Sequence, residues 1–174
     1  MQRLRRIALI VLAVLAAFGA TGLGVAYTLG VFAEAGRFQA APGCAVLDAS
    51  LTAAVVPAAT VEADGDNCTA GDGKTQLNVG FTVVSKQGTV GGPELASRYL
   101  DVVGGSGSER LDGVGDQAIR QRVQAIGQPQ IITMRVSNLI VVLSVASLDG
   151  GELPASADTG LVEVARSLAA KLNT

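Results

Sequence analysis

The sequence predicts an N-terminal transmembrane helix followed by an α+β domain, in which helices pack on one face of an antiparallel sheet of about four strands. Three observations lead to this fold class. Residues 7–33 carry no charged side chain. Apolar and polar residues alternate with period two over 76–83, which is typical of a half-buried strand. Apolar residues recur at helical spacing over 161–172, which indicates an amphipathic helix.

The charge-free run is long enough to cross a bilayer as a helix, because about 20 apolar residues cover the hydrocarbon core. Arg3, Arg5 and Arg6 stand directly before the run. Basic residues that flank a span stay on the cytoplasmic side of the membrane. We therefore expect everything after the run to lie outside the cytoplasm.

These signals divide the chain into four expected parts. Residues 1–6 are a cytoplasmic stub, 7–33 a transmembrane helix, 34–43 a linker and 44–174 an extracytoplasmic α+β domain. The alternative is a cleaved signal peptide, with Ala33-Glu34-Ala35 as the small-x-small cleavage site. The apolar run is about twice as long as that of a signal peptide, which favours a retained anchor in the cell membrane.

The charge balance and the composition exclude several classes of function. Of the 13 basic residues, three precede the run, so the remaining 10 basic and 15 acidic residues give the outer part a net charge of −5. An acidic domain is a poor partner for nucleic acid, which requires a basic surface. The chain has no histidine, the usual base beside a serine or cysteine nucleophile. We therefore expect no enzyme, no catalytic residue, no metal and no cofactor.

Cys44 and Cys68 are the only cysteines. Both fall on the expected outer side, where the compartment is oxidising, so we expect them to form a disulfide. A redox pair would normally be spaced as C-x-x-C, and two thiols without histidine make a poor zinc site. The pair therefore predicts a structural bridge.

The first half of the domain predicts a helix, a loop, a strand and a second helix. Apolar residues at helical spacing run from Cys44 until Pro57 ends the segment. Residues 62–74 are polar, acidic and rich in glycine, which is typical of a loop, and the strand at 76–83 follows. Gly91-Gly92-Pro93-Glu94 is a favourable helix start. The expected buried stripe of this second helix consists of Leu95, Tyr99 and Val102.

The second half predicts three strands and the final helix. Residues 116–126 read as extended, and a flexible loop at 104–108 precedes them. Residues 131–136 and 139–147 are β-branched and apolar, and the two-residue break Ser137-Asn138 between them indicates a hairpin. The nearly continuous apolar run from 139 to 145 predicts a central strand. The final helix is expected to be capped by Ser156 or Asp158.

One further group of short motifs carries a family resemblance. It comprises Gly113-Val114-Gly115-Asp116-Gln117-Ala118, the run at 134–141, and the two cysteines. Together they resemble small exported actinobacterial domains, either membrane-anchored or lipoproteins, and are similar to the extracellular sensor domains of mycobacterial serine/threonine kinases. The resemblance implies an α+β extracytoplasmic module and implies no catalytic residue. The chain departs from the sensor pattern in having one cysteine pair, where those domains often have two.

Two polar loops have alternative interpretations. Glu62, Asp64, Asp66 and Asp72 form an acidic stretch of the kind that binds calcium, but the EF-hand pattern fails, which favours a solvated loop. Gly71-Asp72-Gly73-Lys74-Thr75 matches only the end of a phosphate-binding loop, since the required earlier glycine is absent. We expect an ordinary loop at both places.

Arg120, Arg122 and Arg135 are the candidate residues for binding an anionic ligand or partner. Alternate positions in a strand share a face, so Arg120 and Arg122 would point the same way. Arg135 joins them if its strand lies alongside with matching register. The alternative is a solvated sheet face whose charges discourage edge pairing.

These observations leave two functional hypotheses. In the first, a single-pass membrane protein binds a small ligand or an envelope protein through its outer domain. In the second, the chain is an accessory or structural subunit of a membrane complex in the cell envelope. The first predicts a concave, partly apolar pocket or an arginine-lined groove, and the second predicts an exposed apolar patch.

Overall fold

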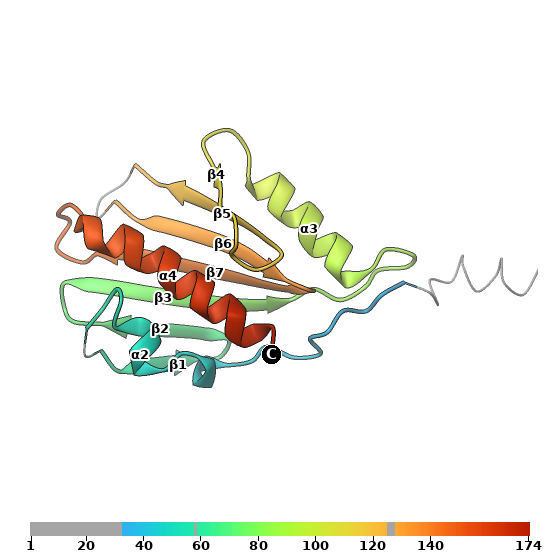
Figure 1. Ribbon diagram of the computed structural model, residues 1–174, viewed down its shortest axis with the longest axis horizontal. Helices are drawn as coiled ribbons and strands as arrows, with labels where there is room; N and C mark the ends of the chain where they lie inside the picture. The colour runs from blue at the N-terminus through green and yellow to red at the C-terminus, as the bar shows by residue number, and fades with distance from the viewer. Residues whose placement is uncertain (1–32, 58, 125–127) are drawn as a thin grey trace, which may run out of the picture.

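An antiparallel sheet forms the centre of the computed structural model, which describes residues 33–57, 59–124 and 128–174. In these ranges the sheet has seven strands in the order β1-β2-β3-β7-β6-β5-β4 (Figure 1). The middle strand is β7 (Leu139–Ser147), which lies between β3 (Thr75–Val83) and β6 (Gln130–Val136). The apolar run over 139–145 was therefore correctly predicted as a central strand.

Four more strands flank this centre: β1 (Val61–Asp64), β2 (Asn67–Gly71), β4 (Glu109–Arg110) and β5 (Gln117–Arg122). The expected number of about four strands was too low, and the prediction of a loop over 62–74 was wrong. Strands β1 and β2 were missed because only their inward residues, such as the buried Cys68 and Ala70, are apolar, and these are small. The rest of the two strands is polar because it faces solvent.

Helices lie on both faces of the sheet, so the prediction that they pack on one face was wrong. Helix α4 (Ala155–Leu172) covers one face, and α3 (Gly92–Val103) packs on the other. Alternate residues of a strand point to opposite faces. Accordingly, Leu139, Val141 and Leu143 of β7 belong to the α4 core, whereas Ile140 packs with Ala96 and Leu100 of α3.

Most of the hydrophobic core lies between α4 and the sheet. The final helix buries Leu161, Val164 and Leu168, which are the residues that its periodicity indicated. The expected cap is wrong, however. The helix begins at Ala155 after Pro154 with no side-chain cap, and Asp158 lies in its first turn.

The helix expected from Cys44 to Pro57 is interrupted. It consists of a 3₁₀ turn, η1 (Cys44–Val46), and the one-turn helix α2 (Ala49–Thr52). Asp48 separates them, and its side chain accepts a hydrogen bond from the Leu51 N–H, capping α2. Asp48 thus favours a new helix start over continuation of the old one.

No helix in the described ranges has the length and apolar character that crossing a membrane requires. The predicted transmembrane helix at 7–33 lies, except for its last residue, outside these ranges.

Candidate functional site

Part of the sheet surface opposite α4 is not covered by a described helix. Helix α3 packs on that surface mainly against β5, β6 and β7. The corresponding face of β1, β2 and β3, which we call the open face, carries polar side chains that are exposed or half-buried. They are Glu62, Thr69, Gln76, Asn78 and Thr82. An antiparallel sheet tolerates such a face because it needs only one apolar side.

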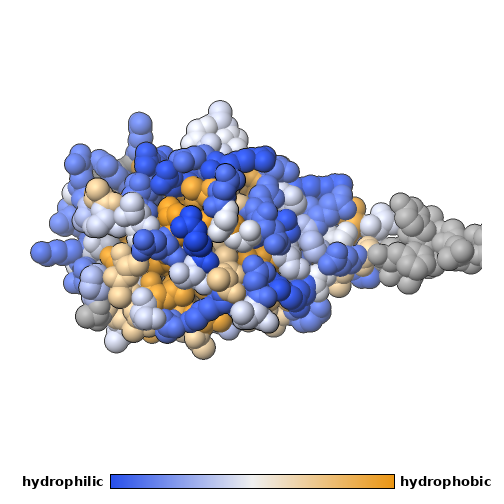
Figure 2. Space-filling model, in the orientation of Figure 1, coloured by the Kyte–Doolittle hydropathy of each residue, from blue (hydrophilic) through white to orange (hydrophobic). Residues whose placement is uncertain are grey.

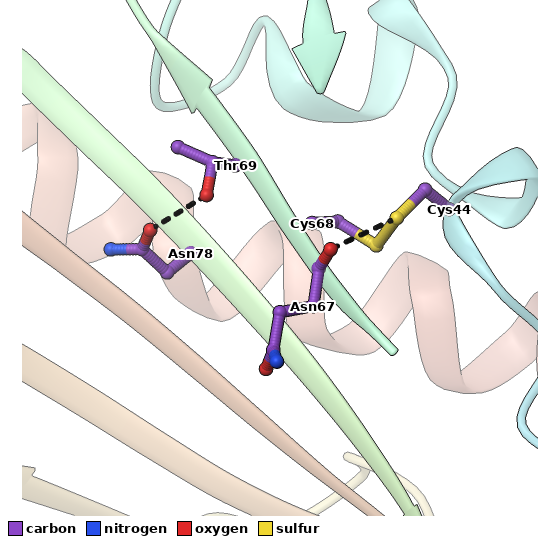
Figure 3. Close-up of a disulfide and its surroundings, with 5 residues drawn as sticks. All are labelled: Cys44, Asn67, Cys68, Thr69 and Asn78. Carbon is purple, nitrogen blue, oxygen red and sulfur yellow. Dashed lines mark hydrogen bonds between the residues drawn. A yellow bond between two sulfur atoms is a disulfide. The ribbon is translucent and has the colours of Figure 1, made fainter. Parts of the chain in front are cut away.

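Hydrogen bonds order the centre of the open face. The Thr69 hydroxyl donates to Asn78 Oδ1 across the strand pair at 3.1 Å (Figure 3). The Gln76 side-chain amide donates to the same oxygen at 2.9 Å. The open face therefore presents a fixed array of amide and hydroxyl groups.

The exposed flank of α3 borders the open face. Ser97 and Asp101 bond to Gln117 of β5, so this side of the helix faces the β4–β5 edge of the sheet. Leu95, Tyr99 and Val102 lie on the other side, at i, i+4 and i+7. That flank, which we call the α3 stripe, therefore faces the β3 half.

The prediction that this stripe is buried was wrong for Tyr99 and Val102, whereas Leu95 is half-buried. Tyr99 is 47% exposed and Val102 is 83% exposed, and the helix buries Gly92, Ala96 and Leu100 instead. The small residues Gly92 and Ala96 let α3 approach the sheet closely, which turns the larger apolar residues outward. As a result, the apolar α3 stripe lies beside the polar open face.

A small pocket marks the far end of the open face. It has a volume of about 250 Å³ and includes Glu62, Thr69, Gln76 and Leu148 in its lining. Leu148 follows β7 and is 54% exposed. This end therefore repeats the combination of an apolar side chain beside polar strand residues.

A second concave region lies on the opposite side of the molecule, between α2 and α4. It has a volume of about 520 Å³, and its lining includes Leu51, Ala170, Asp48 and Lys171. Figure 2 shows apolar surface in this region among hydrophilic side chains. Its two charged groups form an ion pair with each other at 2.5 Å, so they do not present an unpaired charge to a ligand.

The structure brings two of the three candidate arginines together. Arg120 and Arg122 share the α4 face of β5, as their spacing predicted, and both bond to Asp158 of α4 at 3.2 and 2.8 Å. Arg120 also pairs with Glu109 at 2.6 Å. The hydrogen bond to Glu109 and the charge of Asp158 raise the pKa of the Arg120 guanidinium. Two carboxylates thus balance two guanidinium groups.

Arg135 lies on the other face of the sheet, opposite Gln117 in the β5–β6 register. It pairs with Asp116 at 3.1 Å and donates to the Ser137 carbonyl oxygen at 3.0 Å. Its Nε atom is buried and has no hydrogen-bond partner among the described residues. The three arginines therefore do not form one patch, and their anion-binding role stays a prediction.

Cys44 and Cys68 form the disulfide that the sequence predicted (Figure 3). The bridge joins η1 to the start of β2, and the Cys68 side is 1% exposed. The Cys44 sulfur also lies 3.4 Å from the Asn67 carbonyl oxygen. The bridge holds the segment before α2 against the outer strands.

The loop expected at 71–75 is a tight turn between β2 and β3, whereas Glu62 and Asp64 of the acidic stretch lie in strand β1. The side chain of Asp72 accepts from the backbone N–H groups of Thr75 and Lys74 at 2.7 and 2.9 Å, and these bonds lower its pKa. This arrangement closes the β2–β3 hairpin. Within the described ranges, no group of three acidic or cysteine side chains is placed to hold a metal ion.

No protein-family model, curated protein or solved structure matches the chain. The resemblance to actinobacterial sensor domains therefore stays a prediction.

The sequence did not show that the α3 stripe is exposed, because helical spacing identifies the apolar side of a helix but not what covers that side. The open face had a signal, namely the alternating Gln76, Asn78 and Thr82 in β3.

Proposed function

We propose that the chain is a single-pass membrane protein whose extracytoplasmic domain binds a partner protein at the cell envelope. In this proposal residues 7–33 are the anchor, and the α3 stripe with the open face is the binding surface. The disulfide supports an oxidising compartment, because structural disulfides are rare in the cytosol.

One observation carries the binding role: Tyr99 and Val102 are exposed on the side of α3 that faces the uncovered strands. Exposed apolar side chains beside an ordered polar surface are typical of interaction sites, in which aromatic residues are enriched. The acidic residues Glu62 and Asp64 lie on the same side of β1, so a neutral or basic polypeptide segment fits better than an acidic one.

A photo-crosslinking amino acid at position 102 of the full chain tests the binding surface in native membranes. We expect a discrete adduct with an envelope protein from position 102 and none from position 166, an exposed site on α4. Identical adduct patterns at both positions, or none at either, would contradict the proposed surface. A cytoplasm-only fluorescent reporter fused after Thr174 should stay dark if the topology is correct.

The alternative is an accessory subunit held permanently in a membrane complex. The exposed apolar residues of the α3 stripe also favour this reading. The two hypotheses differ in how permanently the partner is bound. A subunit copurifies with its complex in fixed ratio after mild detergent extraction, whereas a binding domain dissociates from its partner on dilution.

A further inference from the structure

The segment expected to be a linker is bound to the domain. We call residues 34–38 the strap. The backbone N–H of Phe38 donates to Asn138 Oδ1, and the Asn138 side-chain amide donates back to the Phe38 carbonyl oxygen, both at 2.9 Å. The Arg37 N–H donates to the Ser137 hydroxyl at 3.1 Å. The side chains of the β6–β7 turn thus hold the backbone of the strap.

Asn138 is buried for this purpose. It is 1% exposed, and its amide also donates to the Val84 carbonyl oxygen at 3.1 Å. A buried polar side chain is stable only when its hydrogen bonds are satisfied, and two of these three side-chain hydrogen bonds join Asn138 to the strap. Removing the strap would leave Asn138 largely unsatisfied.

Two hydrogen bonds and one close contact fix the strap at three further points. The Gly92 N–H donates to the Glu34 carbonyl oxygen at 2.9 Å, so the strap begins against the first turn of α3. Gly36 has a φ of +98°, and a Cβ there would overlap the Asn138 side chain. At the other end of the strap, Arg37 reaches Asn173 at 2.9 Å and ties it to the end of α4.

The position of the strap relative to the proposed anchor has a geometric consequence. The anchor would end at residue 33, and Glu34 already bonds to the domain. At a rise of 1.5 Å per residue, the 27 residues of the expected anchor span about 40 Å as a helix, which is the thickness of a bilayer with both headgroup layers. No length of the anchor therefore remains beyond the headgroup surface. A domain held this closely has no room to stand clear of the lipid.

The exposed loop at 85–89 lies at the same end of the molecule as the start of the strap (Figure 1). It contains Lys86 and the uncharged residues Ser85, Gln87, Gly88 and Thr89. We propose that this end of the domain lies against the phospholipid headgroups and that the strap holds it there in one orientation. This inference rests on the proposed membrane anchor. The nine-residue strand β3 then places the opposite end about 27 Å away.

The absence of tryptophan from the chain provides a direct test. Gln87→Trp places a fluorophore in the 85–89 loop, and Leu148→Trp places one at an exposed apolar position at the far end. The full chain is reconstituted into phosphatidylcholine vesicles with bromine atoms high in the acyl chains. We expect Gln87→Trp to lose emission and shift to the blue, whereas Leu148→Trp changes in neither respect. Equal quenching at both positions, or no quenching at position 87, would overturn the proposed orientation.

A matched pair of glycine variants tests the strap itself. Gly36→Ala and Gly43→Ala both force alanine into a positive φ, but a Cβ at position 43 meets nothing within 4 Å. In the Gln87→Trp background, we expect Gly36→Ala to abolish the selective quenching and Gly43→Ala to retain it. Unchanged quenching in Gly36→Ala, with the strap shown to be displaced by its faster amide exchange, would refute the role of the strap.

Alkaline carbonate extraction of the same vesicles separates this inference from the proposed function. A chain released by carbonate lacks a membrane anchor, which refutes both proposals. A chain that is retained but shows no difference between positions 87 and 148 keeps its anchor and refutes only the orientation.

Discussion

At the scale of single residues, Asn138 determines more of the structure than its position in a turn suggests. It joins the strap, the β6–β7 turn and the end of β3 through hydrogen bonds to Phe38 and Val84. The sequence indicated a turn at Ser137-Asn138, and the turn exists. Within this turn Ser137 has the positive φ, +55°, and the Asn138 side chain bonds to the strap.

We predict that Asn138→Ala lowers the free energy of unfolding by about 2–3 kcal/mol, because backbone groups of Phe38 and Val84 lose their partners. Urea titration measures this change. Asn67→Ala, at an exposed residue of β2, is the control and should have a much smaller effect. Equal losses in the two variants would show that the strap bonds contribute little.

Asp48 gives the domain a predictable dependence on pH. The hydrogen bond from Lys171, assisted by Ser50 and the Leu51 N–H, holds the pKa of Asp48 well below its usual range. Since the folded state favours the carboxylate, this stabilisation is present at neutral pH and is lost as the pH falls through the folded-state pKa.

We therefore predict that Asp48→Asn is less stable than the parent protein at pH 7. Asparagine still caps α2, so the change isolates the ion pair. The difference in free energy of unfolding should narrow as the pH falls below about 4, where aspartate protonates in the unfolded chain. Urea titrations across this pH range measure it. A gap that stays constant would assign the effect to packing, and Asp64→Asn serves as the exposed control.

At the scale of elements, periodicity predicted which segments are regular better than it predicted what covers them. β7 and α4 were found because their apolar patterns are long. The sequence did not indicate that helices cover both faces of the sheet. The reason is that α3 buries the small residues Gly92 and Ala96, which add little to the apolar periodicity of the helix. β1 and β2 were missed because their polar segments are stabilised by pairing between strands, β1 with β2 and β2 with β3, and a local sequence pattern does not report this pairing.

The orientation of α3 can be tested by comparing its two apolar sides. Leu100 is fully buried, so Leu100→Ala should lower the free energy of unfolding by about 2–5 kcal/mol. Tyr99→Ser combined with Val102→Ser should change it by less than about 1 kcal/mol, because exposed positions contribute little. Thermal or urea unfolding distinguishes them. A larger loss of unfolding free energy in the double variant than in Leu100→Ala would show that the stripe is buried, as the sequence predicted.

The disulfide can be tested at the same scale. The bridge closes a loop with a sequence separation of 24 residues, for which the chain-entropy model gives roughly 3.5 kcal/mol of stabilisation. We predict a loss of about this size for Cys44→Ser combined with Cys68→Ser, measured against the oxidised parent. Reduction of the parent with dithiothreitol should give a similar loss. A stability independent of both treatments would exclude a structural role.

At the scale of the whole molecule, the strap determines whether the folded domain would be flexibly tethered to the proposed anchor or held to it in one orientation. A flexible linker would let the domain rotate freely above the proposed anchor. A bound strap instead makes residues 34–38 part of the folded unit, together with α3, the β6–β7 turn and the end of α4. The direction in which the α3 stripe points would then be set relative to the bilayer, which limits the partners that can reach it.

Hydrogen exchange on the full chain in detergent micelles tests whether the strap is part of the folded domain. The N–H groups of Arg37 and Phe38 bond to Ser137 and Asn138, so we expect their exchange to be slow and comparable to that of core strand amides such as Val141. An amide hydrogen exchanges quickly when its segment unfolds independently of the rest of the protein. Asn138→Ala should accelerate exchange at Phe38 by about tenfold or more while Val141 stays slower. Fast exchange at Phe38 in the parent protein would show that the strap belongs to a flexible linker, as the sequence predicted for residues 34–43.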